Sequence, residues 1–204
     1  MRFERYPSSV RSRRSAARIT LERALDRVLI DLPSGVVLDV GAKWAQYRDR
    51  VPQTEYLTLD IRPESGPDIV GDLHDVPRES SSVDTVIATE VLEHCYDPAQ
   101  AVDEIHRLLR PGGVCVITTR FIHLYHPDPH DYFRFTRDGL AHLFRAFSEV
   151  QIQPLGNRIH AVWMLLPHRP RPVGWLMAAC TPLVASIDMP RTSNPCGYLV
   201  RAVR

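Results

Sequence analysis

Short apolar runs alternate with segments of helical periodicity along most of this chain. Seven runs predict buried strands, at residues 36–40, 56–60, 68–70, 83–89, 114–118, 149–154 and 197–203. Before the first run, apolar residues recur three and four positions apart, which predicts a helix carrying Leu21, Leu25, Val28, Leu29 and Leu32. Strands that alternate with helices are typical of an α/β fold, in which helices cover a mainly parallel sheet.

Capping residues locate two further helices between these strands. Asp97 can cap a helix that begins at Pro98, and residues 110–113 are expected to end it. Its apolar stripe consists of Ala101, Val102, Ile105, Leu108 and Leu109. Thr136 can cap the next helix, which would bury Leu140, Leu143, Phe144 and Phe147. These boundaries divide the chain into an N-terminal helical segment, residues 1–34, and a main domain, residues 35–204.

One stretch before the last strand does not follow the alternation. Residues 156–190 are rich in Pro, Trp and Met, and we interpret them as a helical insertion that forms a lid or a dimerisation element. Their apolar side chains are too numerous for a monomer surface, which favours a homodimer. Within the insertion, residues 173–187 are apolar but shorter than a bilayer span and interrupted by Pro182. We therefore expect no integral membrane segment.

Composition narrows the class of protein further. The 204 residues are 44% hydrophobic, enough for one domain that buries roughly 70% of its unfolded surface. A formal net charge of +1 lacks the basic excess of a general nucleic-acid binder, although arginines cluster near the N-terminus. The four cysteines are widely spread and form no C-x-x-C pair, which argues against a zinc site or disulfide framework. Without a secretory signal pattern, we expect a cytoplasmic protein with reduced thiols.

The first strand runs directly into a turn that begins with Gly41. A dinucleotide-binding loop has the pattern G-x-G-x-x-G, in which the second glycine lets the backbone approach the pyrophosphate. Lys43 and Gln46 occupy the positions of the later glycines in this chain. The loop therefore disfavours a nicotinamide oxidoreductase and suits a nucleoside ligand that has no pyrophosphate.

Five motifs in register resemble the class I S-adenosylmethionine-dependent methyltransferases. They are VVLDVG, the strand ending in Asp60, GDL at residues 71–73, SVDTVIATEVLEH at residues 82–94, and LLRPGGVCVITT at residues 108–119. The similarity covers about residues 36–155. It implies a single-domain, Rossmann-like, seven-stranded sheet with an antiparallel last strand, and S-adenosyl-L-methionine as the methyl donor.

The resemblance and the strand ends together indicate the donor site. Ligands of open α/β sheets bind at the carboxyl ends of the strands. There we expect Asp60 to accept hydrogen bonds from both ribose hydroxyls, Asp72 and Leu73 to flank the adenine, and Glu90 to border the methionine moiety. Three further cofactor-binding residues are expected in the first loop: Asp39, which orients the loop or receives the ligand's amino group, Gly41, and Lys43, which is near the ligand's carboxylate or is simply solvated.

A loop rich in histidine follows the fifth strand. Residues 121–136 read FIHLYHPDPHDYFRFT, and an imidazole with an ordinary pKa of about 6.5 can take a proton from an acceptor hydroxyl. We expect His126 or His130 to be the general base and Asp131 to orient it or to bind substrate hydroxyls. His123, Tyr132 and Arg134 are the expected substrate-binding residues. Alternatively, the prolines fix a structural turn that the histidines cap.

A metal ion is a further alternative for this loop. Closely spaced carboxylates and imidazoles can hold a divalent ion that acidifies a substrate hydroxyl. Carboxylate ligands suit Mg²⁺, which makes Asp128 and Asp131 the expected ligands.

The segment PHDYFRFT also resembles small methyltransferases of glycan and polysaccharide biosynthesis. This resemblance implies a saccharide hydroxyl as acceptor, such as a mannoside or another oligosaccharide. The arginine-rich, nearly lysine-free composition is typical of high-GC actinobacteria, which make methylmannose polysaccharides. A natural-product small-molecule methyltransferase and a non-catalytic S-adenosylmethionine-binding protein are the alternatives. Nucleic acid is not expected, because T-E-V-L-E-H replaces the D/N-P-P-Y/F clamp of amino-group base methylation.

Overall fold

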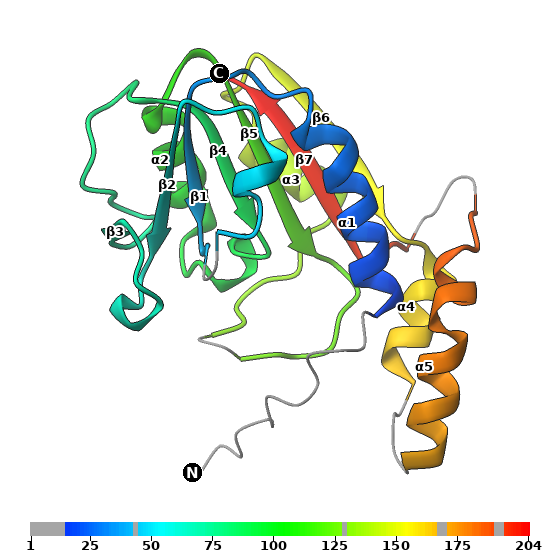
Figure 1. Cartoon of the computed structure of the whole chain (residues 1–204). Coiled ribbons are helices and arrows are strands. Elements are labelled where there is room, and N and C mark those ends of the chain that lie inside the picture. Colours follow the sequence, from blue (N-terminus) through cyan, green and yellow to red (C-terminus); the bar gives the residue numbers. More distant parts are fainter. Residues whose placement is uncertain (1–14, 43–44, 128–129, 167–170, 190–193) are drawn as a thin grey trace.

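A seven-stranded sheet in the order β3-β2-β1-β4-β5-β7-β6 forms the centre of the protein in a computed structural model (Figure 1). The structure describes residues 15–42, 45–127, 130–166, 171–189 and 194–204. The strands are β1 Val36–Val40, β2 Glu55–Asp60, β3 Ile69–Val70, β4 Val83–Thr89, β5 Leu109–Arg120, β6 Glu149–Leu155 and β7 Gly197–Val203. Neighbours among β1 to β5 pair in parallel, whereas β7 is antiparallel to both β5 and β6. The predicted α/β fold with an antiparallel last strand is confirmed.

Alternating side chains bury both faces of the sheet. In β5, Cys115 and Ile117 join one core cluster, whereas Val114 and Val116 join the other. A strand with this pattern is covered on both sides, which explains why the sequence shows continuous apolar runs rather than polar alternation. Figure 1 shows α2 and α3 on one face of the sheet and α1 on the other.

The helices are α1 Ala16–Leu29, α2 Pro98–Leu108, α3 Arg137–Leu143, α4 Arg158–Leu165 and α5 Arg171–Ala185. The predicted caps are present. The Asp97 side chain accepts hydrogen bonds from Ala99 N and Gln100 N, and Thr136 accepts one from Gly139 N. Both caps satisfy amide groups that the first turn of a helix leaves without intrahelical partners.

The N-terminal helix shares the core of the main domain. Leu21, Leu25 and Leu29 of α1 are fully buried in the same cluster as Val37 and Leu199 of the sheet. The helix also packs against α4 and α5, which form the predicted insertion between β6 and β7. Residues 16–29 are therefore part of the domain's structural unit. Among the helices that the structure describes, none is long and apolar enough to cross a membrane.

The end of α2 differs from the sequence-based prediction. Leu109, predicted to close the helix's apolar stripe, is the first residue of β5 and pairs with Val83. The following glycines belong to this strand, and a Cβ at Gly113 would lie 2.9 Å from the carbonyl oxygen of Arg110. The close backbone approach explains a glycine inside a strand.

Candidate active site

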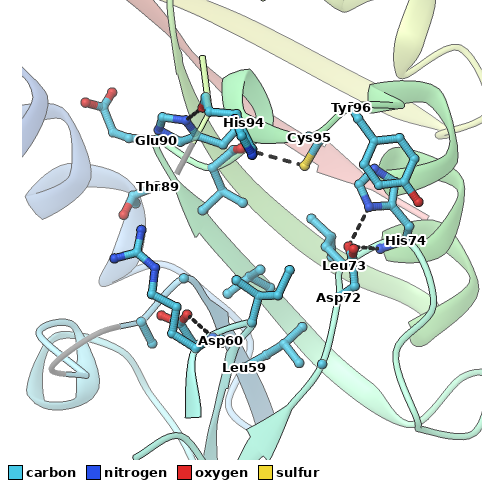
Figure 2. A pocket seen from close by; sticks show the side chains of 18 of the residues that line it. Leu59, Asp60, Asp72, Leu73, His74, Thr89, Glu90, His94, Cys95 and Tyr96 are labelled. Atoms are coloured by element: carbon cyan, nitrogen blue, oxygen red, sulfur yellow. Dashed lines mark hydrogen bonds and ion pairs between the residues drawn. The ribbon is translucent and has the colours of Figure 1, made fainter. Parts of the chain in front are cut away.

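A cavity of about 850 Å³ opens at the carboxyl ends of β1, β2 and β4. Its volume lies within the roughly 300–1,000 Å³ of typical small-molecule sites. The cavity is lined by residues that include Arg18, Gly41, Gln46, Asp60, Asp72, Leu73, His74, Thr89, Glu90, His94, Cys95, Tyr96, His126, His130 and Tyr132 (Figure 2). Eight of the residues expected at the site therefore meet at one surface: Gly41, Asp60, Asp72, Leu73, Glu90, His126, His130 and Tyr132.

The turn after β1 requires its glycine. Gly41 has a φ of +67°, and a Cβ there would lie 2.8 Å from Cγ2 of Val91. Its N–H donates to the carbonyl of Leu59 at 2.8 Å, which ties the turn to β2. A left-handed backbone and a close contact both exclude a side chain here. The predicted residue Lys43 lies outside the described residues.

Asp60 ends β2 at the wall of the cavity and is 8% exposed. Its Oδ1 accepts a hydrogen bond from the N–H of Arg62 at 2.9 Å, which fixes the carboxylate's orientation (Figure 2). A carboxylate that is held in this way is pre-organised to accept hydrogen bonds from a ligand's hydroxyl groups.

Asp72 and Leu73 lie on the segment that follows β3, together with His74. Oδ1 of Asp72 accepts the N–H of His74 at 3.0 Å and lies 2.5 Å from its ring Nδ1 (Figure 2). The ring of His74 stacks on Tyr96, with 3.9 Å between ring centroids. The Asp72 carboxylate is thus held by its own loop, and the stacked rings form a flat apolar wall.

Glu90 follows β4 in a conformation that is rare for a residue with a side chain. Its φ is +59°, and its N–H donates to the carbonyl of Thr118 at 2.9 Å. The carboxylate forms an ion pair with Arg120, whose burial lowers the pKa of the guanidinium to about 10. Left-handed non-glycine residues of this kind cluster at binding sites.

Asp39 does not line the cavity. It is buried in the sheet, where the hydroxyl of Tyr56 donates to its Oδ2 at 2.7 Å. Burial raises the pKa of this carboxyl to about 7, against the opposing effects of the Tyr56 hydrogen bond and the charge of Arg48. Its position favours a role in orienting the loop over direct ligand contact.

The buried Asp39 predicts a pH-dependent stability. Because its folded pKa lies above its ordinary value, the folded state holds an extra proton between about pH 4 and 7, and stability falls as pH rises through this window. The contribution reaches at most about 1.4 kcal/mol per pH unit. Because asparagine does not titrate, Asp39→Asn is expected to reduce the dependence of the unfolding free energy on pH. Urea unfolding at a series of pH values measures it. An unchanged slope would contradict the buried, protonated carboxyl.

The loop after β5 lies only partly on the cavity. His126, His130 and Tyr132 line it, whereas His123 and Arg134 lie outside its wall. The N–H of Tyr132 donates to the carbonyl of Glu93 at 2.9 Å, which holds the loop against the end of β4. Of the three residues expected to bind the substrate, Tyr132 lines the cavity, whereas His123 and Arg134 do not.

Asp131 is occupied by interactions within its loop. Its carboxylate forms a bidentate ion pair with Arg134, with Oδ2 2.6 Å from Nη2, and accepts the N–H of His126 at 2.9 Å. These partners hold the pKa of Asp131 far below its usual range. Because this carboxylate is already paired with a guanidinium, it does not suit the role of an Mg²⁺ ligand that the sequence predicted. Asp128, the other expected ligand, lies outside the described residues. Asp131 instead positions the backbone of His126.

Burial keeps two of the loop histidines neutral. It lowers the pKa of His123 to about 4 and also lowers the pKa of His126, where the charge of His94 adds to the effect. His130 is exposed, and its ring lies 5.4 Å from that of Tyr132. Of the two histidines expected to act as base, His130 thus has the more open position on the cavity.

Several lining residues were missed by sequence reasoning. Arg18 comes from α1, more than twenty residues before β2, and its guanidinium contacts Oε1 of Gln46 at 3.3 Å. His74, Cys95 and Tyr96 belong to segments whose side-chain directions no local pattern defines. The apolar stripe of α1 predicted that a helix is present, but it did not predict which end of the helix borders the cavity.

Residues 38–117 match the family described as "methyltransferase domain". Among curated relatives, a probable S-adenosylmethionine-dependent methyltransferase of Mycolicibacterium smegmatis is 47% identical over 67 residues, covering 33% of this chain and 23% of that protein. The ubiquinone biosynthesis O-methyltransferase of Psychrobacter arcticus is 56% identical over 36 residues, 18% of this chain and 14% of that protein. The matches thus span about a quarter or less of these relatives' length.

Solved structures support the same fold. A SAM-dependent methyltransferase from Archaeoglobus fulgidus aligns with a TM-score of 0.57 at 14% identity, covering 93% of this chain and 95% of that one. Phosphoethanolamine N-methyltransferase 2 of Haemonchus contortus, in complex with S-adenosyl-L-methionine, aligns with a TM-score of 0.62 at 13% identity, covering 91% and 52%. Residues 38–117 of this chain thus match a methyltransferase domain, and the whole described chain shares the fold of solved S-adenosylmethionine-dependent methyltransferases.

Proposed function

We propose that this protein transfers the methyl group of S-adenosylmethionine to a hydroxyl group of a saccharide. The observation that carries the proposal is that the Asp60 carboxylate and the histidine-bearing loop line the same cavity. Asp60, Asp72 and Leu73 line one part of the cavity and can hold a nucleoside. The imidazole of His130 lines another part, beside the exposed ring of Tyr132. Both halves of a transfer reaction thus have a place in it.

The donor half of the cavity fits an adenosine and an amino-acid moiety. In the proposed arrangement Asp60 accepts the ribose hydroxyls, Leu73 covers one face of the adenine, and Gly41 lets the chain turn beneath the ligand. Glu90 lies where the methionine end would extend, although its ion pair with Arg120 must be shared with the ligand. Bound S-adenosylmethionine supplies an electrophilic methyl group on a sulfonium.

The acceptor half fits a hydroxyl group that loses its proton during transfer. His130 is the general base in this proposal, because it is exposed on the cavity, whereas His126 is only partly exposed there. In-line methyl transfer needs little covalent help from the protein, so positioning and proton removal account for the catalysis.

An exposed aromatic ring supports a saccharide as the acceptor. Tyr132 is 49% exposed and lines the cavity beside His130, whereas Tyr96 stacks on His74 at the proposed adenine end. Rings that expose a face and a hydroxyl can stack on a sugar and hydrogen-bond to it. A phenolic natural product could use the same ring, and the acceptor test below distinguishes the two classes.

Methyl-labelled donor tests the proposal against matched panels of mannosides, glucosides and phenols. We expect labelled product with a saccharide and none without protein. Turnover confined to phenols would favour the natural-product alternative. Donor binding without turnover on any acceptor would favour a non-catalytic binding protein.

The α4–α5 pair is proposed to form a homodimer contact. Its exposed apolar side chains include Val162, Leu165, Trp175, Leu176 and Leu183, and Figure 1 shows the pair lying beside the sheet beyond α1. Sedimentation velocity of the full chain is expected to give twice the monomer mass, and Leu176→Glu should shift the population to monomer. A monomer at every concentration tested would contradict the proposal.

A further inference from the structure

Three metal-ligating side chains from two separate segments converge at the edge of the cavity. Glu93 and His94 lie in a short 3₁₀ helix after β4, and His126 comes from the loop after β5. One ligand atom from each lies within 4.8 Å of the other two. The set differs from the carboxylates expected from sequence, because Asp131 is bound to Arg134.

Glu93 offers an oxygen that no hydrogen bond satisfies among the described residues. The side chain is 0% exposed, and its Oε2 accepts the hydroxyl of Thr119 at 2.9 Å. Its Oε1 is buried, and Nε of Arg120 lies 3.9 Å from it, beyond hydrogen-bond distance. Burial raises the pKa of this carboxyl to about 7. A buried carboxylate oxygen without a donor is costly unless something binds it.

His94 is oriented as a metal ligand would be. Its Nδ1 contacts the carbonyl oxygen of His130, so that this nitrogen carries the proton and Nε2 presents a lone pair. Histidines that ligate metals usually donate their second ring N–H to a carbonyl or carboxylate in this manner.

His126 completes the set from the opposite side. Its Nδ1 is buried, has no hydrogen-bond partner within the described chain, and lies 3.8 Å from Oδ2 of Asp131. The ring stacks on His94, with 5.0 Å between centroids. Asp131 also holds the backbone of His126 through a 2.9 Å hydrogen bond.

The local charge also favours a cation. The carboxylates of Glu90, Glu93 and Asp131 lie near the guanidinium groups of Arg120 and Arg134. Three acidic side chains therefore share two guanidinium groups. A divalent cation would compensate the remaining negative charge and satisfy both unpartnered atoms.

We propose that Glu93, His94 and His126 bind a divalent transition-metal ion of the Zn²⁺ type. Two imidazoles and one carboxylate form a ligand set used by Zn²⁺ sites that keep an open position, whereas Mg²⁺ prefers oxygen ligands. Ligand atoms about 2.1 Å from a tetrahedral Zn²⁺ ion lie about 3.4 Å apart, so these atoms, which are within 4.8 Å of one another, would approach by up to about 1.4 Å. His94 and His126 line the cavity, so the open position faces it.

If the proposed function holds, this ion would lie beside the acceptor and make its hydroxyl more acidic. The metal site itself needs neither donor nor acceptor, and it is tested in the absence of both. Its failure would therefore leave the methyltransferase proposal intact.

Metal binding is measured on the full chain after chelator treatment and exchange into metal-free buffer. Titration with Co²⁺, followed by visible absorption, and with Zn²⁺, followed by calorimetry, is expected to reach one ion per chain. Mg²⁺ is expected to give no saturable heat. His126→Ala and Glu93→Gln should each weaken Zn²⁺ binding at least 100-fold, as expected for loss of a ligand.

His142→Ala is the matched control, because this histidine is exposed on α3 and belongs to no such cluster. Circular dichroism verifies that each variant is folded. If Glu93→Gln unfolds, His126→Ala alone carries the test, since its ring is partly exposed. Absence of Co²⁺ and Zn²⁺ binding, or equal binding by wild type and His126→Ala, would overturn the site.

Discussion

Asp60→Ala is expected to remove detectable binding of S-adenosylmethionine at concentrations that saturate the wild type. The proposed role of this carboxylate is to accept two ribose hydroxyls, and hydrogen bonds to a charged acceptor contribute about 1.5–3 kcal/mol each. Loss of both corresponds to about 3 kcal/mol or more, at least roughly 100-fold in affinity. Calorimetry on the purified variant measures the effect directly.

Two further variants make this result interpretable. Asp60→Asn keeps the shape and loses the charge, so we expect an intermediate affinity. Asp103→Ala removes an exposed carboxylate of α2 that does not line the cavity, and we expect it to bind like wild type. Wild-type affinity in Asp60→Ala would show that the donor's ribose is not held at the end of β2.

His130→Ala is expected to lower kcat by about 10²–10⁴ while the dissociation constant of S-adenosylmethionine stays within a factor of two or so, because a general base contributes at that order. The residue lines the acceptor side of the cavity and contacts the ring of Tyr132. Its carbonyl, which orients His94, is retained in the variant. Single-turnover kinetics with labelled donor separates the chemical step from binding.

The histidine on α3 again supplies a control. His142→Ala should keep wild-type kcat, and added imidazole should restore part of the activity of His130→Ala. A loss of donor affinity equal to the loss of kcat would indicate a structural role for His130. Full activity in His130→Ala would exclude it as the base.

The sheet was predictable from sequence because the residues that define each strand or helix lie next to one another in the chain. Continuous apolar runs located the strands, Asp97 and Thr136 located two helix starts, and the alternation of elements predicted the parallel core. The exception at Leu109 has a local cause as well. A buried leucine is equally typical of a helix stripe and of a buried strand. Leu109 belongs to the strand because it pairs with Val83.

The cavity was predictable only in part, because its contacts join distant segments. Carboxyl ends of parallel strands meet at one edge, so Asp60 and Glu90 could be placed together in advance. No periodicity shows that Arg134 binds Asp131, that Tyr56 binds Asp39, or that Glu93 keeps an oxygen without a donor. Such pairings depend on side-chain directions, which become visible only in three dimensions.

Titration calorimetry of the folded full chain with S-adenosylmethionine, and separately with S-adenosylhomocysteine, tests the central claim most directly. The account predicts saturable heat with both compounds at one site per chain, and competition between them for it. No heat with either compound up to about 1 mM, where even a weak site would begin to fill, would contradict it.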